Sequence, residues 1–128
     1  MAKAITDAVY DAALTNIADN ADKLFLCSAQ PATYAEASST YKLASFDLTV
    51  GDGNGDFVIA NGDTSGRKLT IAAQTGATAT ATGTATHAAF CDSANSLIKA
   101  VTTITSQVIT SGNTVNTGAI DLEIQDPE

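Results

Sequence analysis

The sequence predicts a mainly β protein, an antiparallel β-sandwich or barrel of about seven strands with an N-terminal α-helix. Three features support this fold class. Threonine, a β-branched residue that favours strands, occurs 19 times in 128 residues. Apolar and polar residues alternate over most of the chain after residue 42, and clusters of Gly, Asn and Asp separate these runs. Helical periodicity is confined to the first part of the chain.

The helix is predicted over about residues 5–19. Thr6 is a suitable N-cap, and apolar residues such as Ile5, Val9 and Ile17 recur at spacings of three or four. We expect this stripe to pack on the sheet of its own domain or at a subunit junction.

Strands are predicted from about residue 22 onward. The run at 23–28 is apolar at consecutive positions, which is typical of a strand buried on both faces. Thr33 and Glu36 fit a capping box and predict a short helical turn at about 33–38. Further strands are expected at 45–50, 57–60, 67–73, 77–86, 97–110 and 120–125, and the 77–86 strand has Ala on one face and Thr on the other.

Length and charge limit the possible functions. We expect 1–128 to form a single domain. The net charge of −8 argues against nucleic acid and against an anionic membrane surface as partners. The start of the chain has no signal-peptide pattern, so we expect synthesis in the cytoplasm of the cell that makes the protein. Large apolar side chains are scarce, because 24 residues of the apolar fraction are alanine. Such a thin core is often completed by the surface of another subunit, so we expect a homo-oligomer and, first of all, a trimer.

A weak calcium-loop pattern is formed by Asp52, Asn54 and Asp56. These residues match the first three ligand positions of an EF-hand, but Phe57 stands where the motif has Gly and no flanking helices are predicted. Asp, Asn and Gly are also the common turn residues between strands. A turn is therefore the favoured interpretation, and calcium binding is the alternative.

Catalytic chemistry has little support in the sequence. His87 is the sole histidine, and no second histidine or Gly-x-Ser-x-Gly elbow accompanies it. Arg67 and Lys68 follow Gly66, but the spacing does not fit a phosphate loop, and we expect a charged strand edge there. We therefore predict a protein that is not an enzyme and needs no cofactor.

Cys27 and Cys91 both fall in predicted strands. Buried free thiols are the favoured interpretation for a cytoplasmic product. A disulfide, within or between chains, is the alternative if the protein later meets oxidising conditions.

Several stretches resemble a family of small virion proteins of tailed phages. The resemblance spans most of the chain and rests on the runs at 9–14, 24–28, 65–69, 83–87, 110–115 and 124–127, together with Pro31 and Tyr34. It implies an accessory structural role in the virion, with the major capsid protein or other virion proteins as partners. It implies no catalytic or binding residues.

Three functions follow as alternatives. The first is a capsid decoration or cement protein that stabilises the shell. The second is another virion component, such as a tail, neck or fibre-base subunit. The third is a soluble carbohydrate- or calcium-binding β-module, which would need exposed aromatic residues that the three Tyr and four Phe hardly supply.

Overall fold

The computed structural model describes residues 5–127 and confirms the predicted fold class. The described residues form one α-helix near the N-terminus, one π-helical turn and nine strands in three antiparallel sheets. The elements are α1 (Asp7–Asn20), β1 (Lys23–Cys27), the π-helical turn (Glu36–Thr40), β2 (Lys42–Asp47), β3 (Phe57–Asn61), β4 (Arg67–Ile71), β5 (Gln74–Thr78), β6 (Gly83–Asp92), β7 (Leu97–Ile109), β8 (Thr114–Thr117) and β9 (Ile120–Ile124).

The largest sheet has the strand order β2-β1-β6-β7, and both of its faces are covered around β1. Leu24 and Leu26 on β1 point into the main core, whereas Phe25 and Cys27 contact the segment that contains the π-helical turn. The ring of Phe25 meets that of Tyr34 edge-on, with 6.2 Å between centroids. Two covered faces explain why β1 is apolar at consecutive positions.

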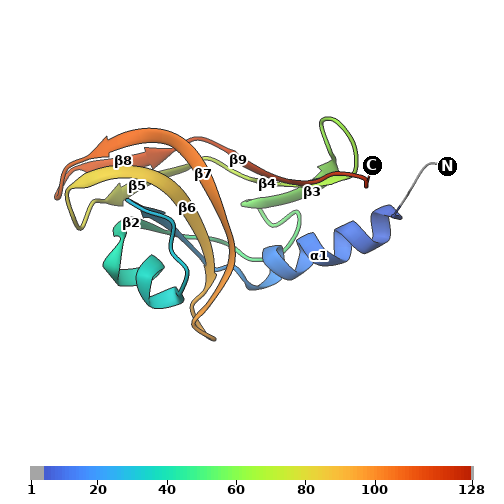
Figure 1. Cartoon of the computed structure of the whole chain (residues 1–128), viewed down its shortest axis with the longest axis horizontal. Helices are drawn as coiled ribbons and strands as arrows, with labels where there is room; N and C mark the ends of the chain where they lie inside the picture. Colours follow the sequence, from blue (N-terminus) through green and yellow to red (C-terminus); the bar gives the residue numbers. More distant parts are fainter. Residues whose placement is uncertain (1–4, 128) are drawn as a thin grey trace.

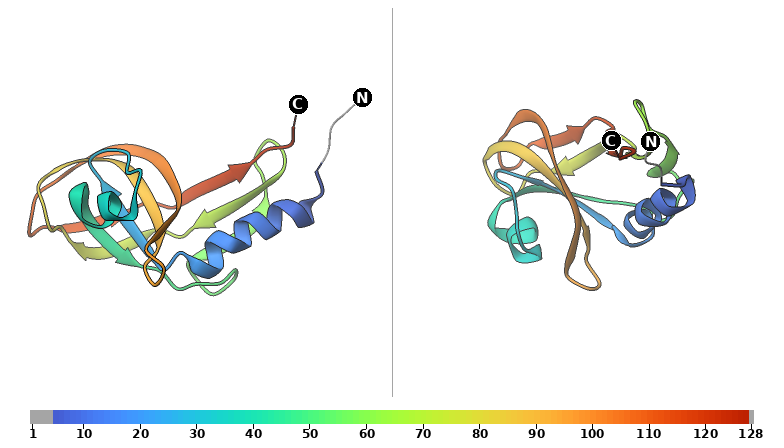
Figure 2. Two further views of the ribbon diagram at one scale, coloured as in Figure 1. Left: turned by 60° about the horizontal axis from the view of Figure 1, so that its bottom comes forward. Right: turned by 45° about the vertical axis from the view of Figure 1, so that its right-hand side comes forward.

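A long two-stranded ribbon connects the two ends of the molecule. β4 continues into β5 after two residues, and β9 follows β8 after two residues, so that β4 pairs with β9 and β5 pairs with β8. At one end β3 joins this ribbon to give the sheet β3-β4-β9. At the other end β5 approaches β2, where Thr80 N donates to Leu43 O at 2.8 Å. Figures 1 and 2 show the resulting elongated shape, with a curved set of strands at one end.

Helix α1 lies along the β3-β4-β9 sheet (Figure 1). Thr6 occupies the predicted N-cap position with extended backbone, but its side chain makes no capping hydrogen bond. The face that packs is Tyr10, Leu14 and Ala18, all of which are buried. The predicted stripe is therefore wrong for Ile5 and Val9, which remain 43% and 58% exposed, whereas Ile17 is partly buried against the main core.

The main core lies between the large sheet, the ribbon and α1. Its largest fully buried side chains include Phe57, Phe90, Leu14, Leu69 and Ile71, and buried alanines fill the remaining contacts.

The Ala/Thr tract at 77–86 is divided between two strands, which corrects the prediction of one long strand. β5 ends at Thr78 and β6 begins at Gly83. Between them, Ala79 N donates to Asn113 O and Thr80 N to Leu43 O, so these backbone groups bind neighbouring segments. The predicted alternation still holds in part, since Ala79 and Ala85 are buried.

The helical turn predicted at about 33–38 is present slightly later, as the π-helical turn at Glu36–Thr40. The capping residues act as predicted in one half of the motif: Glu36 N donates to Thr33 Oγ1 at 3.2 Å. The carboxylate of Glu36 accepts from Ala32 N at 2.9 Å, one residue before the expected donor.

Candidate functional site

The 51–56 loop uses its polar side chains to hold neighbouring backbone. Asp56 Oδ2 accepts from Thr49 N at 2.6 Å, and Asp56 Oδ1 accepts from Gln74 Nε2 at 3.0 Å. Asp52 Oδ1 accepts from Ile59 N at 3.0 Å, while Asn54 Nδ2 donates to Val50 O at 3.0 Å. The three candidate calcium ligands are thus directed to different partners.

Within residues 5–127, no group of three or more His, Cys, Asp or Glu side chains is close enough to hold a metal ion. The arrangement of Asp52, Asn54 and Asp56 fits a turn that joins the end of β2 to β3, with side chains replacing missing backbone partners.

Both cysteines are free and buried, on the face of the large sheet that carries the π-helical turn. Cys27 pairs in register with His87, and Cys91 lies four residues further along β6. At a rise of roughly 3.3 Å per residue, this offset separates the two cysteines by about 13 Å along the strands, far more than a disulfide spans. Burial raises the pKa of Cys27 to about 11 and that of Cys91 to about 12.

His87 lies in the middle of the large sheet, between Cys27 on β1 and Thr103 on β7. Its Nδ1 is 2.8 Å from Thr86 Oγ1. Among the described residues, His87 belongs to no group of three or more potential metal ligands, and a half-buried strand position is the role that the geometry supports.

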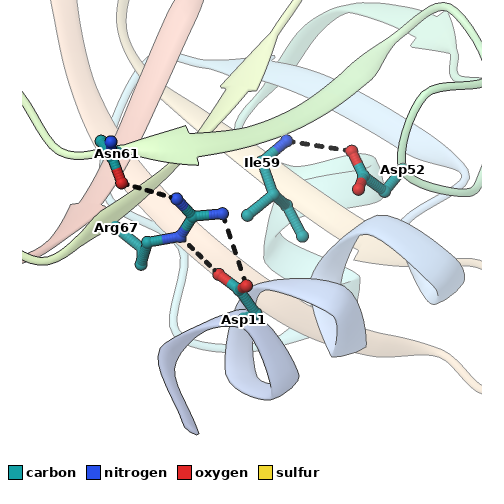
Figure 3. A network of polar contacts seen from close by, with 5 residues as sticks. All are labelled: Asp11, Asp52, Ile59, Asn61 and Arg67. Carbon is teal, nitrogen blue, oxygen red and sulfur yellow. Dashed lines mark hydrogen bonds and ion pairs between the residues drawn. The ribbon is translucent and has the colours of Figure 1, made fainter. Parts of the chain in front are cut away.

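Arg67 links the helix to the sheet (Figure 3). Its guanidinium donates to Asp11 on α1 from Nε at 2.7 Å and from Nη2 at 3.4 Å, and Nη1 donates to Asn61 on β3 at 2.7 Å. The hydrogen bond to Asp11 raises the pKa of Arg67. β4 is the middle strand of its sheet, so the predicted charged strand edge at Arg67 and Lys68 is wrong.

Lys68 points to the other face of that sheet, where it contacts Asp63 at 2.7 Å and Asp121 at 3.7 Å. The hydrogen bond to Asp63 raises the pKa of the Lys68 ammonium. Both cations of the pair are therefore used inside the chain, and neither is left as an anion site.

A further pair of hydrogen bonds holds the residue just before β1. Asp22 accepts from Ser93 N at 2.8 Å and from Ser93 Oγ at 2.5 Å. Burial alone would raise the pKa of Asp22, but the hydrogen bonds from Ser93 outweigh it and the pKa is lowered. This pair connects the α1–β1 junction to the turn between β6 and β7.

A groove of about 500 Å³ lies between β7 and the β8–β9 segment. It is lined by residues 102–107 and 116–121, most of which carry hydroxyl or amide side chains. Asp121 at one end is its single ionisable residue. The groove therefore has the character of a neutral, hydrogen-bonding surface rather than that of a reaction centre.

Sequence reasoning does not find this groove. The β-branched run at 97–110 predicts a strand, but the missing neighbour on one side of β7 depends on how distant segments pair. The short β8 strand, which forms part of the opposite wall, is not among the predicted elements.

Comparisons with known proteins identify no relative: no family model, no curated protein and no solved structure matches the chain. No helix among residues 5–127 has both the length and the apolar character needed to cross a membrane.

Proposed function

We propose that this protein is a non-enzymatic structural component of a tailed-phage virion, and specifically a capsid decoration protein that stabilises the shell. The sequence resemblance to small virion proteins suggests the particle. The observation that supports a structural role is that the charged side chains of Arg67, Asp56 and Asp22 all form hydrogen bonds within the chain.

The charge and the strand edges of the protein favour attachment to its partner through shape complementarity and backbone hydrogen bonds. The chain has six basic residues against fourteen acidic ones, which is too few for a strongly electrostatic grip on an acidic partner. Its strands leave long edges available for pairing. Attachment should therefore survive a salt series, because exposed ion pairs are screened within about 10 Å at 0.1 M salt.

A homotrimer is part of this proposal. Large side chains such as Val9 and Val58 are 58% and 50% exposed, and burial against another subunit would remove them from water. Light scattering of the purified protein should give three times the monomer mass of 13.0 kDa. A monomer at every concentration, and also at the assembled site, would contradict the trimer.

Virion composition tests the assignment itself. Purified particles of the phage that encodes the chain should contain it in a simple whole-number ratio to the major capsid protein, and a map should place it on the outer shell. A small number of copies at the neck or tail would favour the alternative virion component. Absence of the chain from particles would overturn a virion role altogether.

A further inference from the structure

Two unpaired strand edges lie on the walls of the groove. β7 is 13 residues long and pairs with β6 alone, while β8 pairs with β5 alone and β9 with β4 alone. Residues 5–127 supply no strand that pairs with the outer edge of β7 or of the β8–β9 segment. Each of these edges presents backbone N–H and C=O groups that no neighbouring strand uses.

The lining of the groove shows that it follows these edges. Residues 102–107 of β7 and 116–121 of the β8–β9 segment line it without interruption. Successive side chains of a strand point to opposite faces, so a cavity above one face would be lined by alternate residues. A lining of consecutive residues on both sides instead places the cavity alongside the two backbones.

The dimensions suit one extended segment. Six residues of strand on each side give a length of roughly 20 Å at about 3.3 Å per residue. The turn at 110–113 reverses the chain between β7 and β8, so an inserted strand would be antiparallel to one wall and parallel to the other. Both pairings are compatible with strand geometry.

The chemistry of the walls selects an uncharged occupant. Ile104 and Ile120 are half-buried and pack against the main core, so they offer apolar contacts to inward-facing side chains. Asp121 already accepts a hydrogen bond from Thr70 Oγ1 at 2.7 Å and lies 3.7 Å from Lys68 Nζ. An acidic segment would meet no free cation among the residues that line the groove and would approach a chain of net charge −8.

The strands that residues 5–127 form in a folded second copy do not fit this groove. An inserted strand must be free on both edges, because it meets a wall on each side. Every strand in the described part of the chain already has at least one paired neighbour. The described strands of a second copy are therefore unsuitable occupants, and an extended segment of a different polypeptide is the occupant that we consider.

We propose that the groove between β7 and the β8–β9 segment binds an extended, uncharged segment of a partner protein by strand addition, with apolar side chains toward Ile104 and Ile120 and hydroxyl side chains toward solvent. The inference rests on the edges and the cavity and does not require the virion assignment. If particles lack the chain but strand addition is observed, only the proposed function fails.

Backbone hydrogen exchange with a defined peptide tests the proposal. The probe is an acetylated and amidated heptapeptide of alternating Thr and Val. Saturable protection of amides within 102–107 and 116–121 is expected. A peptide of the same sequence with N-methyl groups on alternate residues should protect at most one wall, because these groups block one edge of an extended strand. Absence of protection at millimolar peptide, or protection elsewhere only, would overturn the proposal.

Charge variants locate the bound peptide. A peptide with Glu at the Thr positions should bind more weakly than the neutral one, and Thr105→Lys should reduce that difference by about threefold, as expected for an exposed ion pair. Thr84→Lys is the matched control, since Thr84 is exposed on β6 outside the groove, and it should leave the difference unchanged. Equal responses of the two variants would contradict binding in the groove. Protection of the groove amides in peptide-free protein that disappears on dilution would indicate a second copy as the occupant and would also contradict the proposal.

Discussion

Arg67 on β4 and Asp11 on α1 lie 56 positions apart in the sequence and form two hydrogen bonds, from Nε to Oδ1 at 2.7 Å and from Nη2 to Oδ2 at 3.4 Å. The side chain of Arg67 is 18% exposed and that of Asp11 is 36% exposed. This two-point contact fixes the rotation of the helix as well as its position, because a planar guanidinium aligns with one face of a carboxylate.

Replacing Arg67 with Met should lower the urea midpoint of unfolding and increase proteolysis near α1. Asp11→Asn should have a smaller effect of the same sign, and the double variant should be less destabilised than the sum of the single variants. Lys99→Met is the control, since Lys99 also reaches α1 but bonds to the neutral Asn16. Additive effects of the Arg67 and Asp11 changes would show that the contact does not couple the two elements.

Gly66 ends the turn that leads into β4, with φ at +68°. A Cβ at this position would lie 1.9 Å from Ile124 O, so Gly66→Ala has to displace the backbone at the end of β9. We expect a loss of about 2–4 kcal/mol in the free energy of unfolding, of which about 1–2 kcal/mol reflects the left-handed conformation.

Gly53→Ala is the matched control for Gly66→Ala. Gly53 has φ at +81°, but a Cβ added at that position would have nothing within 4 Å. Its substitution should therefore cost only the conformational term of about 1–2 kcal/mol in urea denaturation. Equal losses for the two variants would mean that the contact with Ile124 O relaxes freely.

The fold class is accessible from the sequence because strand alternation and turn residues are local signals. The run at 97–110 predicts one bent strand or two, and β7 is a single strand. The packed face of α1 cannot be predicted from the sequence, because Val9 and Tyr10 each begin a stripe with helical spacing and alanines occur in both stripes. The larger Tyr10 and Leu14 occupy the core, and Val9 remains in solvent.

The candidate sites differ in how far the sequence predicts them. Asp52, Asn54 and Asp56 are recognisable in the sequence as a turn or a calcium loop, and local hydrogen bonds explain why a turn forms. The groove beside β7 depends on which strands lack a neighbour, and this follows from long-range topology rather than from any local pattern. The division of the 77–86 tract has the same origin, since the backbone of Thr80 pairs with distant Leu43.

The thiols of Cys27 and Cys91 should be unreactive in the folded protein. With pKa values of about 11 and 12, the thiolate fraction at pH 8 is on the order of one in a thousand or less. A thiol reagent should label neither residue at pH 8 until urea unfolds the chain. Thr105→Cys, at an exposed position, is the control that should react at once. Rapid labelling of native Cys27 would show that the π-helical turn opens readily.

Asp56 is expected to act in folding rather than in calcium binding. Asp56→Ala removes the acceptor of Thr49 N and of Gln74 Nε2 and should cost about 1–3 kcal/mol in the free energy of unfolding. Calcium at millimolar concentration should leave the melting temperature of the unmodified protein unchanged. A calcium-dependent rise that Asp52→Asn abolishes would instead support the loop as a calcium site.

Asp22 should make stability depend on acidic pH. Burial disfavours its carboxylate, but the hydrogen bonds from Ser93 favour it more strongly, so the pKa of Asp22 in the folded chain is lowered from the ordinary value of 3.8. The folded state therefore binds this proton less readily than the unfolded state, so the contribution is complete above pH 3.8 and declines as the pH falls through the lowered folded value.

The test compares urea unfolding of the unmodified protein and Asp22→Asn between pH 6 and pH 2. The introduced amide keeps one acceptor but carries no charge, so the variant should be less stable at pH 6 by about 1 kcal/mol, allowing for solvent screening at this partly exposed site. The difference between the two proteins should shrink toward pH 2, where Asp22 is increasingly protonated. Ser93→Ala should reproduce part of the loss at pH 6, because it removes the hydroxyl donor while the Ser93 backbone donor remains. A stability difference that stays constant from pH 6 to pH 2 would show that the charge of Asp22 is not what joins the α1–β1 junction to the β6–β7 turn.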